Sequence, residues 1–391
     1  MNSTNHESPD RPRVLVSGAG ISGLTTAYWL DRHGFDVTVV EVAPRPRPGG
    51  HAVDVRGPAL EVAERMGVAA ALRDRATRLA GIAVVDSSGR ETFRSTTGTL
   101  TSGRLDSPDV EVLRDDLCRV LRDAVGDRVE HLFGDSVTSL VQDGSGVDVA
   151  FATAAPRRFE VVVGADGVGS GVRRTAFGPD ERFVREFGDL HVAVFSMPNF
   201  LGLERWEVVY QREDPFIGAL VMGLSADEPA RAYLGFSAPE AVGDVRDVDG
   251  QKRLLADRVA DGGWVVPRIV EHMMDADDFH FYRLSQVRVD GWSRGRVVLV
   301  GDAGYAVSLG TGQATSVGMV GAYVLAGELA AHRDDLPRGL AAYEDALRDY
   351  AVRNQDIALE LNSAPRDAAD DDLPDFGSLT LPFALKDYAV R

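Results

Sequence analysis

The sequence is short of cysteine, of positive charge and of long apolar runs, and each shortage excludes a class of protein. The single cysteine, Cys118, rules out an internal disulfide and fits a reducing compartment. The 42 basic residues against 60 acidic ones leave a net charge of −18, which argues against nucleic acid or an anionic membrane as a partner. No run approaches about 18 consecutive apolar residues, so we expect no membrane span and a cytoplasmic location.

Histidine is also scarce, and this bears on catalysis. None of the 8 histidines is paired at i, i+4 spacing, and neither a metal-ligand cluster nor a Ser/His/Asp set is visible. Residues 1–12 are polar without an apolar core, so we expect a disordered lead-in and no signal peptide. The length of 391 residues, 44% of them apolar, suits two domains that share a substantial core.

The most informative stretch is residues 13–41. A short β-branched run stops at Gly18, and Gly18, Gly20 and Gly23 fit the G-x-G-x-x-G pattern of a tight turn, a close backbone approach and helix–strand packing. A helical segment and a second strand follow and end at Glu41, 18 residues after Gly23. At that position a carboxylate accepts hydrogen bonds from a ribose, so this order predicts dinucleotide binding.

The next segments carry arginines whose partners the sequence leaves open. Residues 42–50 form a proline-stiffened loop in which Arg47 could meet a phosphate or simply be solvated. Asp54 could bond a cofactor or merely orient Arg56. A helix is expected from Val110 to Ala124, and Arg114 on its apolar face needs either a core acid or a buried phosphate.

Two further glycine-rich motifs follow predicted buried strands. Gly164-Ala165-Asp166-Gly167 makes a tight loop whose aspartate braces backbone N–H groups, which is equally typical of a structural turn. Gly301-Asp302 places a carboxylate at the end of a strand, where α/β folds bind ligands, and Gly312 precedes a long helix of small residues. No lysine or arginine occurs between Gly301 and Ala330, so positive potential here is expected from backbone N–H groups and the helix dipole.

Residues 181–280 have a different character, with aromatic and β-branched residues alternating with polar ones. This pattern predicts a mostly antiparallel, half-buried sheet on which a substrate could lie. Five side chains are candidate pocket walls, although each taken singly is more typical of ordinary core: His191, Tyr210, Phe216, Tyr233 and Phe236.

Together the three motifs resemble the single-component flavin monooxygenases of the para-hydroxybenzoate hydroxylase type, which include aromatic polyketide hydroxylases and tetracycline-inactivating enzymes. The similarity covers roughly residues 12–335. It implies an α/β fold with a Rossmann-type FAD-binding domain, an interleaved and mostly antiparallel substrate domain, and a C-terminal helix. We expect a discontinuous FAD-binding domain (13–78, 105–180 and 281–335), a substrate domain (79–104 and 181–280), and a C-terminal helix and tail (336–391).

The resemblance also implies roles for individual residues. Glu41 would hold the adenosine ribose, Arg114 would lie near the pyrophosphate, Asp54 beside the flavin, and Asp302 at the ribityl chain. Asp166 belongs to a motif linked to both FAD and the nicotinamide donor, and Arg47 is a plausible NADPH contact. The expected cofactor-binding set is Gly18, Gly20, Ile21, Ser22, Gly23, Glu41, Arg47, Asp54, Arg114, Asp166, Gly301, Asp302 and Gly312.

The chain departs from the family pattern at five positions of the third motif. The family commonly has histidine, proline, glycine, asparagine and aspartate where this chain has Tyr305, Leu309, Ala314, Ser316 and Gly321. Because Gly310 and Gly312 keep the loop flexible, the resemblance still implies FAD binding.

The reaction implied is oxygen insertion into an aromatic or polyketide-like small molecule, with NAD(P)H as reductant, O2 as oxidant and a flavin C4a-hydroperoxide as intermediate. Ring hydroxylation, epoxidation and Baeyer–Villiger insertion are not distinguished. Two other readings stay open: a flavin-binding protein that sequesters a ligand without oxygenating it, and a NAD-linked dehydrogenase that uses the first motif alone. The dehydrogenase reading leaves Asp166 and Asp302 unexplained.

Overall fold

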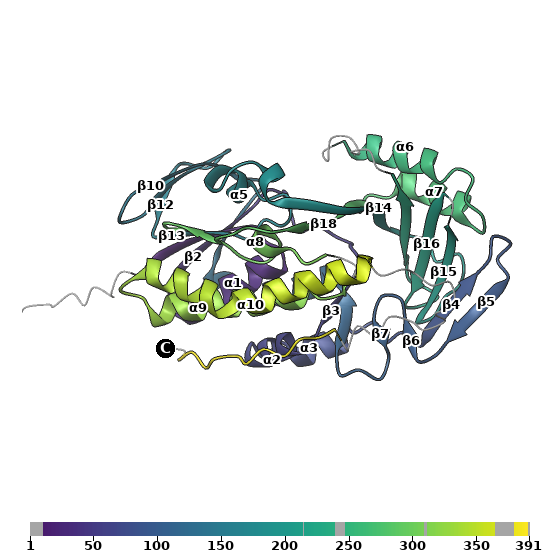
Figure 1. The fold of residues 1–391 in the computed structure, drawn as a ribbon, viewed down its shortest axis with the longest axis horizontal. Coiled ribbons are helices and arrows are strands. Elements are labelled where there is room, and N and C mark those ends of the chain that lie inside the picture. Colours follow the sequence, from purple (N-terminus) through teal and green to yellow (C-terminus); the bar gives the residue numbers. More distant parts are fainter. Residues whose placement is uncertain (1–10, 214, 239–246, 309–310, 364–378, 390–391) are drawn as a thin grey trace, which may run out of the picture.

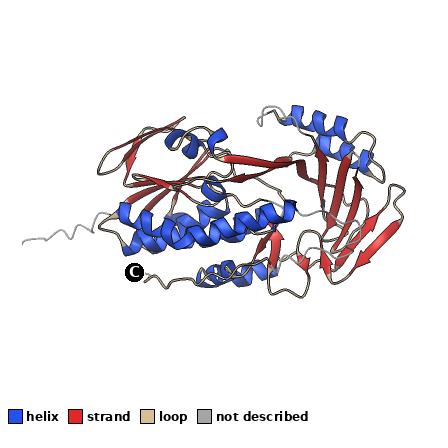
Figure 2. Cartoon of the chain, in the orientation of Figure 1, coloured by secondary structure: helices blue, strands red, loops and turns tan. Residues whose placement is uncertain are grey.

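The computed structural model describes residues 11–213, 215–238, 247–308, 311–363 and 379–389. Two parts lie side by side, one built on a parallel sheet and the other on a larger, mostly antiparallel sheet (Figure 1). Figure 2 shows that long helices gather over the first sheet, whereas the strands of the second form one end of the molecule. The residues from 1 to 10, most of the expected lead-in, fall outside the described part.

The first sheet has six strands with β1 near its middle. β1 pairs in parallel with β2 on one side and β13 on the other, and its apolar residues are fully buried. The order is β19 (Ser293–Arg294), β20 (Val297–Leu299), β13 (Val161–Gly164), β1 (Arg13–Ser17), β2 (Asp36–Glu41) and β9 (Glu130–Phe133).

Parallel pairing brings the three glycine-rich motifs to one edge of this sheet. Ser17 is aligned with both Val40 and Gly164, and Gly164 is aligned with Leu299. Because parallel strands end at the same edge, Gly18, Glu41 and Asp302 all follow strands that finish together. The three motifs therefore lie together at this edge.

The helices that cover this sheet are α1 (Ile21–Arg32), α4 (Arg114–Val125), α9 (Ala314–Ala331) and α10 (Leu336–Ser363). By length and composition, α9 is apolar enough to cross a membrane. Its polar residues interrupt the apolar ones, so it does not stand out as a continuous apolar run in the sequence. In this fold 78% of it is buried against other elements, as in the core helix of a globular protein. Figure 1 shows α10 packed along α9.

The second sheet has seven strands and is covered on one face by α6 (Val248–Arg258) and α7 (Val266–Asp275). Its order is β18 (His280–Val287), β14 (Val184–Met197), β17 (Ala230–Ser237), β16 (Phe216–Gly223), β15 (Trp206–Glu213), β4 (Gly81–Val85) and β5 (Glu91–Ser95). β4 and β5 come from the 79–104 segment, which therefore joins this sheet. The expected domain boundary at residue 281 falls inside β18, because β14 and β18 run across both parts.

The remaining elements are short. They are β3 (Ala52–Val55) paired with β8 (Val110–Leu113), β6 (Gly98–Thr99) with β7 (Gly103–Arg104), the sheet of β10 (Val137–Gln142), β11 (Val147–Phe151) and β12 (Arg157–Phe159), the helices α2 (Pro58–Arg65), α3 (Ala69–Asp74), α5 (Gly171–Ala176) and α8 (Asp302–Tyr305), and the 3-10 turns Gly126–Arg128 and Asp180–Arg182. The expected helix from Val110 is wrong in its first turn. Those residues pair with β3, and the helix begins at Arg114.

The end of the chain is an extended strap, residues 379–389, that follows α2 (Figure 1). Lys386 pairs with the buried Glu328 of α9 at 2.8 Å, and the Tyr388 hydroxyl donates to the same carboxylate at 2.8 Å. At its other end, the side chain of Thr380 accepts a hydrogen bond from Gln313 at 3.2 Å. The tail therefore packs against the first part of the molecule.

Candidate cofactor-binding site

The N-terminus of α1 is an open, uncapped anion site. Gly20 has no side chain to cap the helix, and among the described residues the N–H groups of Ile21, Ser22 and Gly23 find no acceptor. A Cβ built on Gly20 would meet no atom within 4 Å. Free N–H groups and the positive end of the helix dipole thus face open space, which is the arrangement that binds a pyrophosphate.

The other glycines of the first motif are there for packing. A Cβ on Gly23 would lie well inside 3.0 Å of the Gly18 carbonyl oxygen, and a Cβ on Gly18 would lie 2.5 Å from the Ala165 carbonyl oxygen. Gly301, at φ 62°, lets the chain pass directly over the Ser22 hydroxyl, where a side chain would collide. These contacts draw the three motifs together beneath the open Gly20.

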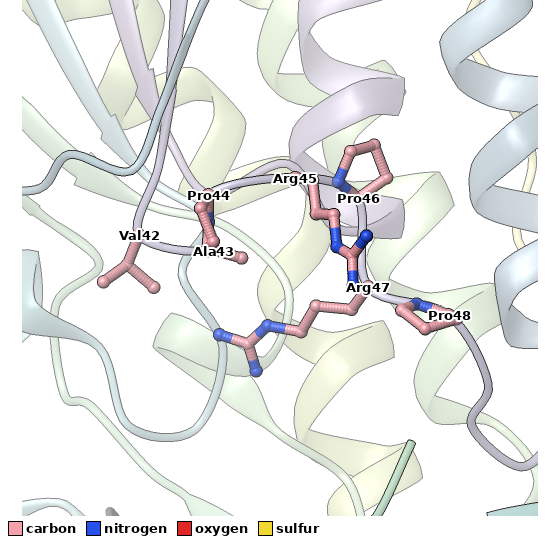
Figure 3. Close-up of a pocket in the computed structure, with 7 residues that line it drawn as sticks. All are labelled: Val42, Ala43, Pro44, Arg45, Pro46, Arg47 and Pro48. Atoms are coloured by element: carbon pink, nitrogen blue, oxygen red, sulfur yellow. The ribbon is translucent and has the colours of Figure 1, made fainter. Parts of the chain in front are cut away.

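Glu41 borders the same opening from the end of β2. One carboxylate oxygen accepts the Ala19 N–H at 2.9 Å and the other accepts the Ala43 N–H at 2.9 Å. Arg47 lies 3.8 Å away across an open hollow of about 320 Å³ lined by residues 42–48. Figure 3 shows the Arg47 side chain reaching back across the bend of this loop toward Val42.

Arg114 and Asp302 lie farther along the site. Within the described part of the chain, neither side chain forms a hydrogen bond or an ion pair of its own, although Arg114 packs on Gly50 and its charge reaches Asp302. Burial raises the pKa of the Asp302 carboxyl to about 6, and the nearby Arg114 opposes the rise. The half-buried Asp302 carboxyl can accept hydrogen bonds from ligand hydroxyls, and the Arg114 guanidinium can pair with a ligand phosphate.

Asp54, Arg56 and Gly312 meet at the far end of the site. Asp54 pairs with Arg56 at 2.8 Å, and both side chains are buried. A Cβ on Gly312, at φ 64°, would lie 3.0 Å from the Asp54 carboxylate and 3.5 Å from the Arg56 guanidinium. The second Asp54 oxygen is buried without a partner among the described residues, and burial raises the pKa of this carboxyl well above its usual range.

Arg56 is the cation that the sequence reasoning missed. The 301–330 segment does lack a cation, but β3 ends next to this segment and supplies one. The backbone N–H of Arg56 donates to Ser316 at 2.9 Å, and the Ser316 hydroxyl donates to the Asp54 carbonyl at 3.1 Å. The only signal in the sequence was the two-residue spacing of Asp54 and Arg56, which was interpreted as possible orientation of the arginine.

Asp166 lies near the site but uses its carboxylate locally. It accepts hydrogen bonds from Ser170 at 2.5 Å, from the Gly171 N–H at 2.8 Å and from the Val172 N–H at 3.1 Å. These bonds hold the start of α5, while the backbone beside Asp166 packs on Gly18. The arrangement favours the structural-turn interpretation of this carboxylate.

Three of the five departures from the family pattern have a structural account. The Tyr305 hydroxyl fills the space that a side chain at Gly321 would occupy, and it lies 2.9 Å from the Tyr343 hydroxyl. The two departures at 305 and 321 therefore compensate each other. Ser316 ties α9 to β3, as described above. Leu309 lies outside the described residues, together with Gly310.

The five candidate pocket residues divide between the two faces of the second sheet. The face toward the cofactor site carries Glu207, Arg231 and Tyr233: the Tyr233 hydroxyl accepts the Ala52 N–H at 2.8 Å, and Arg231 pairs with Asp115 of α4 at 3.4 Å. Phe216 alternates onto this same face, with its ring over Gly218.

The other three candidates point away from the cofactor site. The Tyr210 hydroxyl accepts the Gly263 N–H at 3.1 Å beneath α7, and His191 stacks on Phe236 with ring centres 5.1 Å apart. All three are almost fully buried with the residues under α6 and α7. Their position on the helix-covered face does not support them as pocket walls and favours the interpretation as core.

The donors and acceptors present fit FAD along its whole length. The open N–H groups of α1 suit the pyrophosphate, and Glu41 lies where an adenosine ribose is bound. The Asp302 and Arg114 side chains come next along the site. At the far end, the Gly312 backbone and the Asp54–Arg56 pair can lie against the flavin ring system. No group of three or more His, Cys, Asp or Glu side chains able to hold a metal ion occurs in the described ranges.

Comparison with known proteins supports the same conclusion. Residues 11–357 match the family model described as FAD binding domain. A Legionella longbeachae flavin-dependent monooxygenase is 34% identical over 88% of this chain and 87% of its own length, and a Mycobacterium tuberculosis protein described as uncharacterized is 48% identical over 88% and 91%. The crystal structure of tetracycline destructase Tet(51) superposes with a TM-score of 0.87 over 97% of this chain and 100% of that one, at 31% identity.

These matches span all three motifs, which a dehydrogenase using the first motif alone would not explain. The predicted family, the α/β fold with its C-terminal helix and the FAD cofactor are confirmed. The chain therefore belongs to the FAD-binding domain family and is a flavin-dependent monooxygenase that binds FAD.

Proposed function

We propose that this enzyme uses NAD(P)H and O2 to insert one oxygen atom into an aromatic or polyketide-like small molecule, by ring hydroxylation, epoxidation or Baeyer–Villiger insertion, in the cytoplasm. One observation carries the proposal. The Asp54–Arg56–Gly312 end of the cofactor site faces the side of the second sheet that bears Tyr233, and the Tyr233 hydroxyl is bonded to Ala52, two residues before Asp54. A flat substrate between them would lie against a flavin ring.

Bound FAD supplies the electron transfer and the oxygen activation, and the protein supplies binding, orientation and exclusion of water. The open N–H groups from Ile21 to Gly23 hold the pyrophosphate, and Glu41 accepts from the ribose. Arg114 neutralises phosphate charge, and Asp302 accepts from the ribityl hydroxyls. The Gly312 backbone approaches the flavin closely because no side chain intervenes.

The 42–48 loop is the proposed contact for the nicotinamide donor. Its arginines line an open hollow next to Glu41, and Arg47 is about half exposed with only a 3.8 Å ion pair. A guanidinium held this loosely is available to a phosphate-bearing ligand. This supports Arg47 as an NAD(P)H contact, and it predicts a preference for the donor that carries the additional phosphate.

The proposed substrate surface is the strip of the second sheet around two glycines of β16 and β17. Gly218 and Gly235 are directly opposite one another on β16 and β17, on the face that bears Tyr233 and Phe216. The Phe216 ring lies over Gly218, and two aromatic side chains on one face suit a planar ligand. Tetracycline destructase Tet(51) shares this fold over the full chain, which supports a multi-ring substrate class for the present enzyme.

The test is a screen of aromatic and polyketide ligands for stimulated oxidation of NADPH and NADH, with oxygen uptake and product mass recorded in parallel. We expect at least one ligand class to raise both rates and to gain one oxygen atom. Oxygen uptake that never depends on a ligand, or a ligand that binds without any gain in mass, would contradict the proposal and favour a ligand-sequestering role.

A matched pair of variants tests the proposed surface. Phe216→Leu should change the ligand-stimulated rate while flavin content stays the same. Ile217, the next residue, points to the opposite face and is fully buried, so Ile217→Val should cost about 1 kcal/mol of stability and leave the ligand dependence intact. If the two variants behave alike, the substrate does not lie on this face.

A further inference from the structure

A buried network joins the second sheet to the Arg56 end of the cofactor site. Glu207, on β15, is fully buried and accepts hydrogen bonds from the Leu100 N–H at 2.8 Å and from the Thr101 hydroxyl. The carbonyl of Ser102, the next residue, accepts from the Arg56 guanidinium at 2.8 Å. The turn at residues 100–102 is therefore held between Glu207 on one side and Arg56 on the other.

The charges in this network are unbalanced. Asp54, Asp109 and Glu111 surround the buried Arg56 guanidinium, and a fourth carboxyl, that of Glu207, lies close enough to Glu111 to interact with it. Asp54 and Glu111 each keep one oxygen that is buried without a partner among the described residues. If all four were ionised, the end of the site next to Gly312 would be strongly negative.

We propose that Glu207 is a positioning residue for the flavin: its carboxyl fixes the 100–102 turn, and this turn holds Arg56 with its positive charge directed at the flavin ring beside Gly312. The inference depends on the flavin lying at Gly312, as in the proposed function. It goes beyond that function in assigning a role to a residue on another sheet, which touches neither cofactor nor substrate.

Burial supports the neutral form. Desolvation raises the pKa of the Glu207 carboxyl to about 8, and the neighbouring Glu111 adds to the rise. Glu111 from β8 is the charged group that acts on Glu207, and Glu207 in turn acts on the Tyr233 hydroxyl of β17, which also feels Arg231. The neighbours of Glu207 on β4 and β16, Ile82 and Met222, carry no charge. Above pH 8 the carboxyl ionises and partly cancels the Arg56 charge that an anionic reduced flavin requires.

The raised pKa of Glu207 also determines how the stability of the folded protein changes with pH. A carboxyl whose folded pKa is raised stabilises the folded state below its ordinary pKa of 4.5, and this contribution is lost as the pH rises toward 8. Glu207→Gln keeps a neutral side chain of the same shape and removes the titration. Glu213→Gln is the matched control, because Glu213 is on the same strand but exposed.

The experiment measures the flavin reduction potential of the FAD-loaded parent and both variants from pH 6 to 9. In the parent, the ratio of the affinities for oxidised and reduced FAD should rise by about fivefold or more between pH 7 and pH 9. This rise comes on top of the ordinary pH dependence of the flavin potential. It is the effect expected of one added negative charge at an effective dielectric constant of about 20. Glu207→Gln should match the parent at pH 6–7 and lack this growth, and Glu213→Gln should follow the parent throughout. Thr101→Val, which breaks the link, should lower the potential already at pH 7.

Urea unfolding of the apoprotein over the same pH range is the readout without flavin. A pH-dependent loss of stability that disappears in Glu207→Gln, together with identical potentials in parent and variant, would show that the carboxyl titrates without reaching the flavin and would overturn the proposal. Identical pH profiles in both readouts would overturn it as well. Neither outcome touches the oxygen-insertion assay, which tests the proposed function separately.

Discussion

Substituting Gly20 and Gly23 one at a time separates cofactor binding from helix packing within a single motif. Gly20 faces open space, has an extended backbone (φ −83°, ψ −172°), and lies at the uncapped start of α1. Gly23 lies three residues later and packs directly on the Gly18 carbonyl. Alanine at either position adds the same methyl group, so any difference between the variants comes from what that methyl meets.

The expected magnitudes follow from these surroundings. In Gly20→Ala the apoprotein should lose about 1 kcal/mol, because alanine tolerates this backbone but is a poorer N-cap than glycine. FAD affinity should fall at least about tenfold, since the methyl group occupies the approach of the pyrophosphate to the N–H groups. Gly23→Ala must push α1 away from β1 to relieve a contact far inside 3.0 Å, and it should cost about 1–3 kcal/mol or more of apoprotein stability.

The assay pairs urea unfolding of the flavin-free protein with FAD titration followed by flavin fluorescence. The expected pattern is a stable apoprotein with weak FAD binding for Gly20→Ala, and a destabilised apoprotein for Gly23→Ala. If Gly20→Ala binds FAD as tightly as the parent, the pyrophosphate does not approach this helix terminus, and the cofactor placement is wrong. If Gly23→Ala keeps full stability, the packing argument fails instead.

Two further substitutions test the ends of the site. Glu41→Ala should weaken FAD by about 1–3 kcal/mol, the usual cost of losing a hydrogen bond to a charged group, and an unchanged affinity in the same titration would mean that Glu41 is not the ribose ligand. Gly312→Val should lower the flavin reduction potential and slow reduction by NADPH with a much smaller loss of oxidised FAD, because a side chain at φ 64° would hold the backbone off the ring and press on Asp54. A potentiometric titration beside the parent checks this, and an unchanged potential and rate would place the flavin ring elsewhere.

The sequence alone was sufficient for the nucleotide-binding part, and the reason is physical. Strand, glycine turn, helix and strand follow one another within residues 13–41, so their pattern is short-range and leaves few alternatives. Parallel strands end at one edge of a sheet, so three motifs each placed after a strand had to converge. α9 was likewise expected as a helix of small residues, and it is observed as Ala314–Ala331.

What depended on contacts between distant segments could not be predicted in this way. Val110–Leu113 has β-branched residues at positions compatible with a helix, and only its pairing with β3 makes it a strand. In the second sheet, alternation showed that there are two faces, but not which face meets the cofactor site. Tyr210 and Phe216 were therefore equally good candidates, and the packing of α6 and α7 separated them.

Contacts between distant segments also decided the buried charge network and the way two departures from the family pattern compensate each other. Arg56 and Glu207 are far apart in the sequence, one just after β3 and the other in β15, so their burial in one network was decided by how the β3–β8 pair packs against the second sheet. Tyr305 and Gly321 each look like a loss when compared with the family pattern, yet the hydroxyl of one fills the space left by the other. Local order in the sequence thus determined the cofactor and the chemistry, whereas tertiary packing decided which side chains line the candidate site, because long-range contacts leave no periodic trace in the chain.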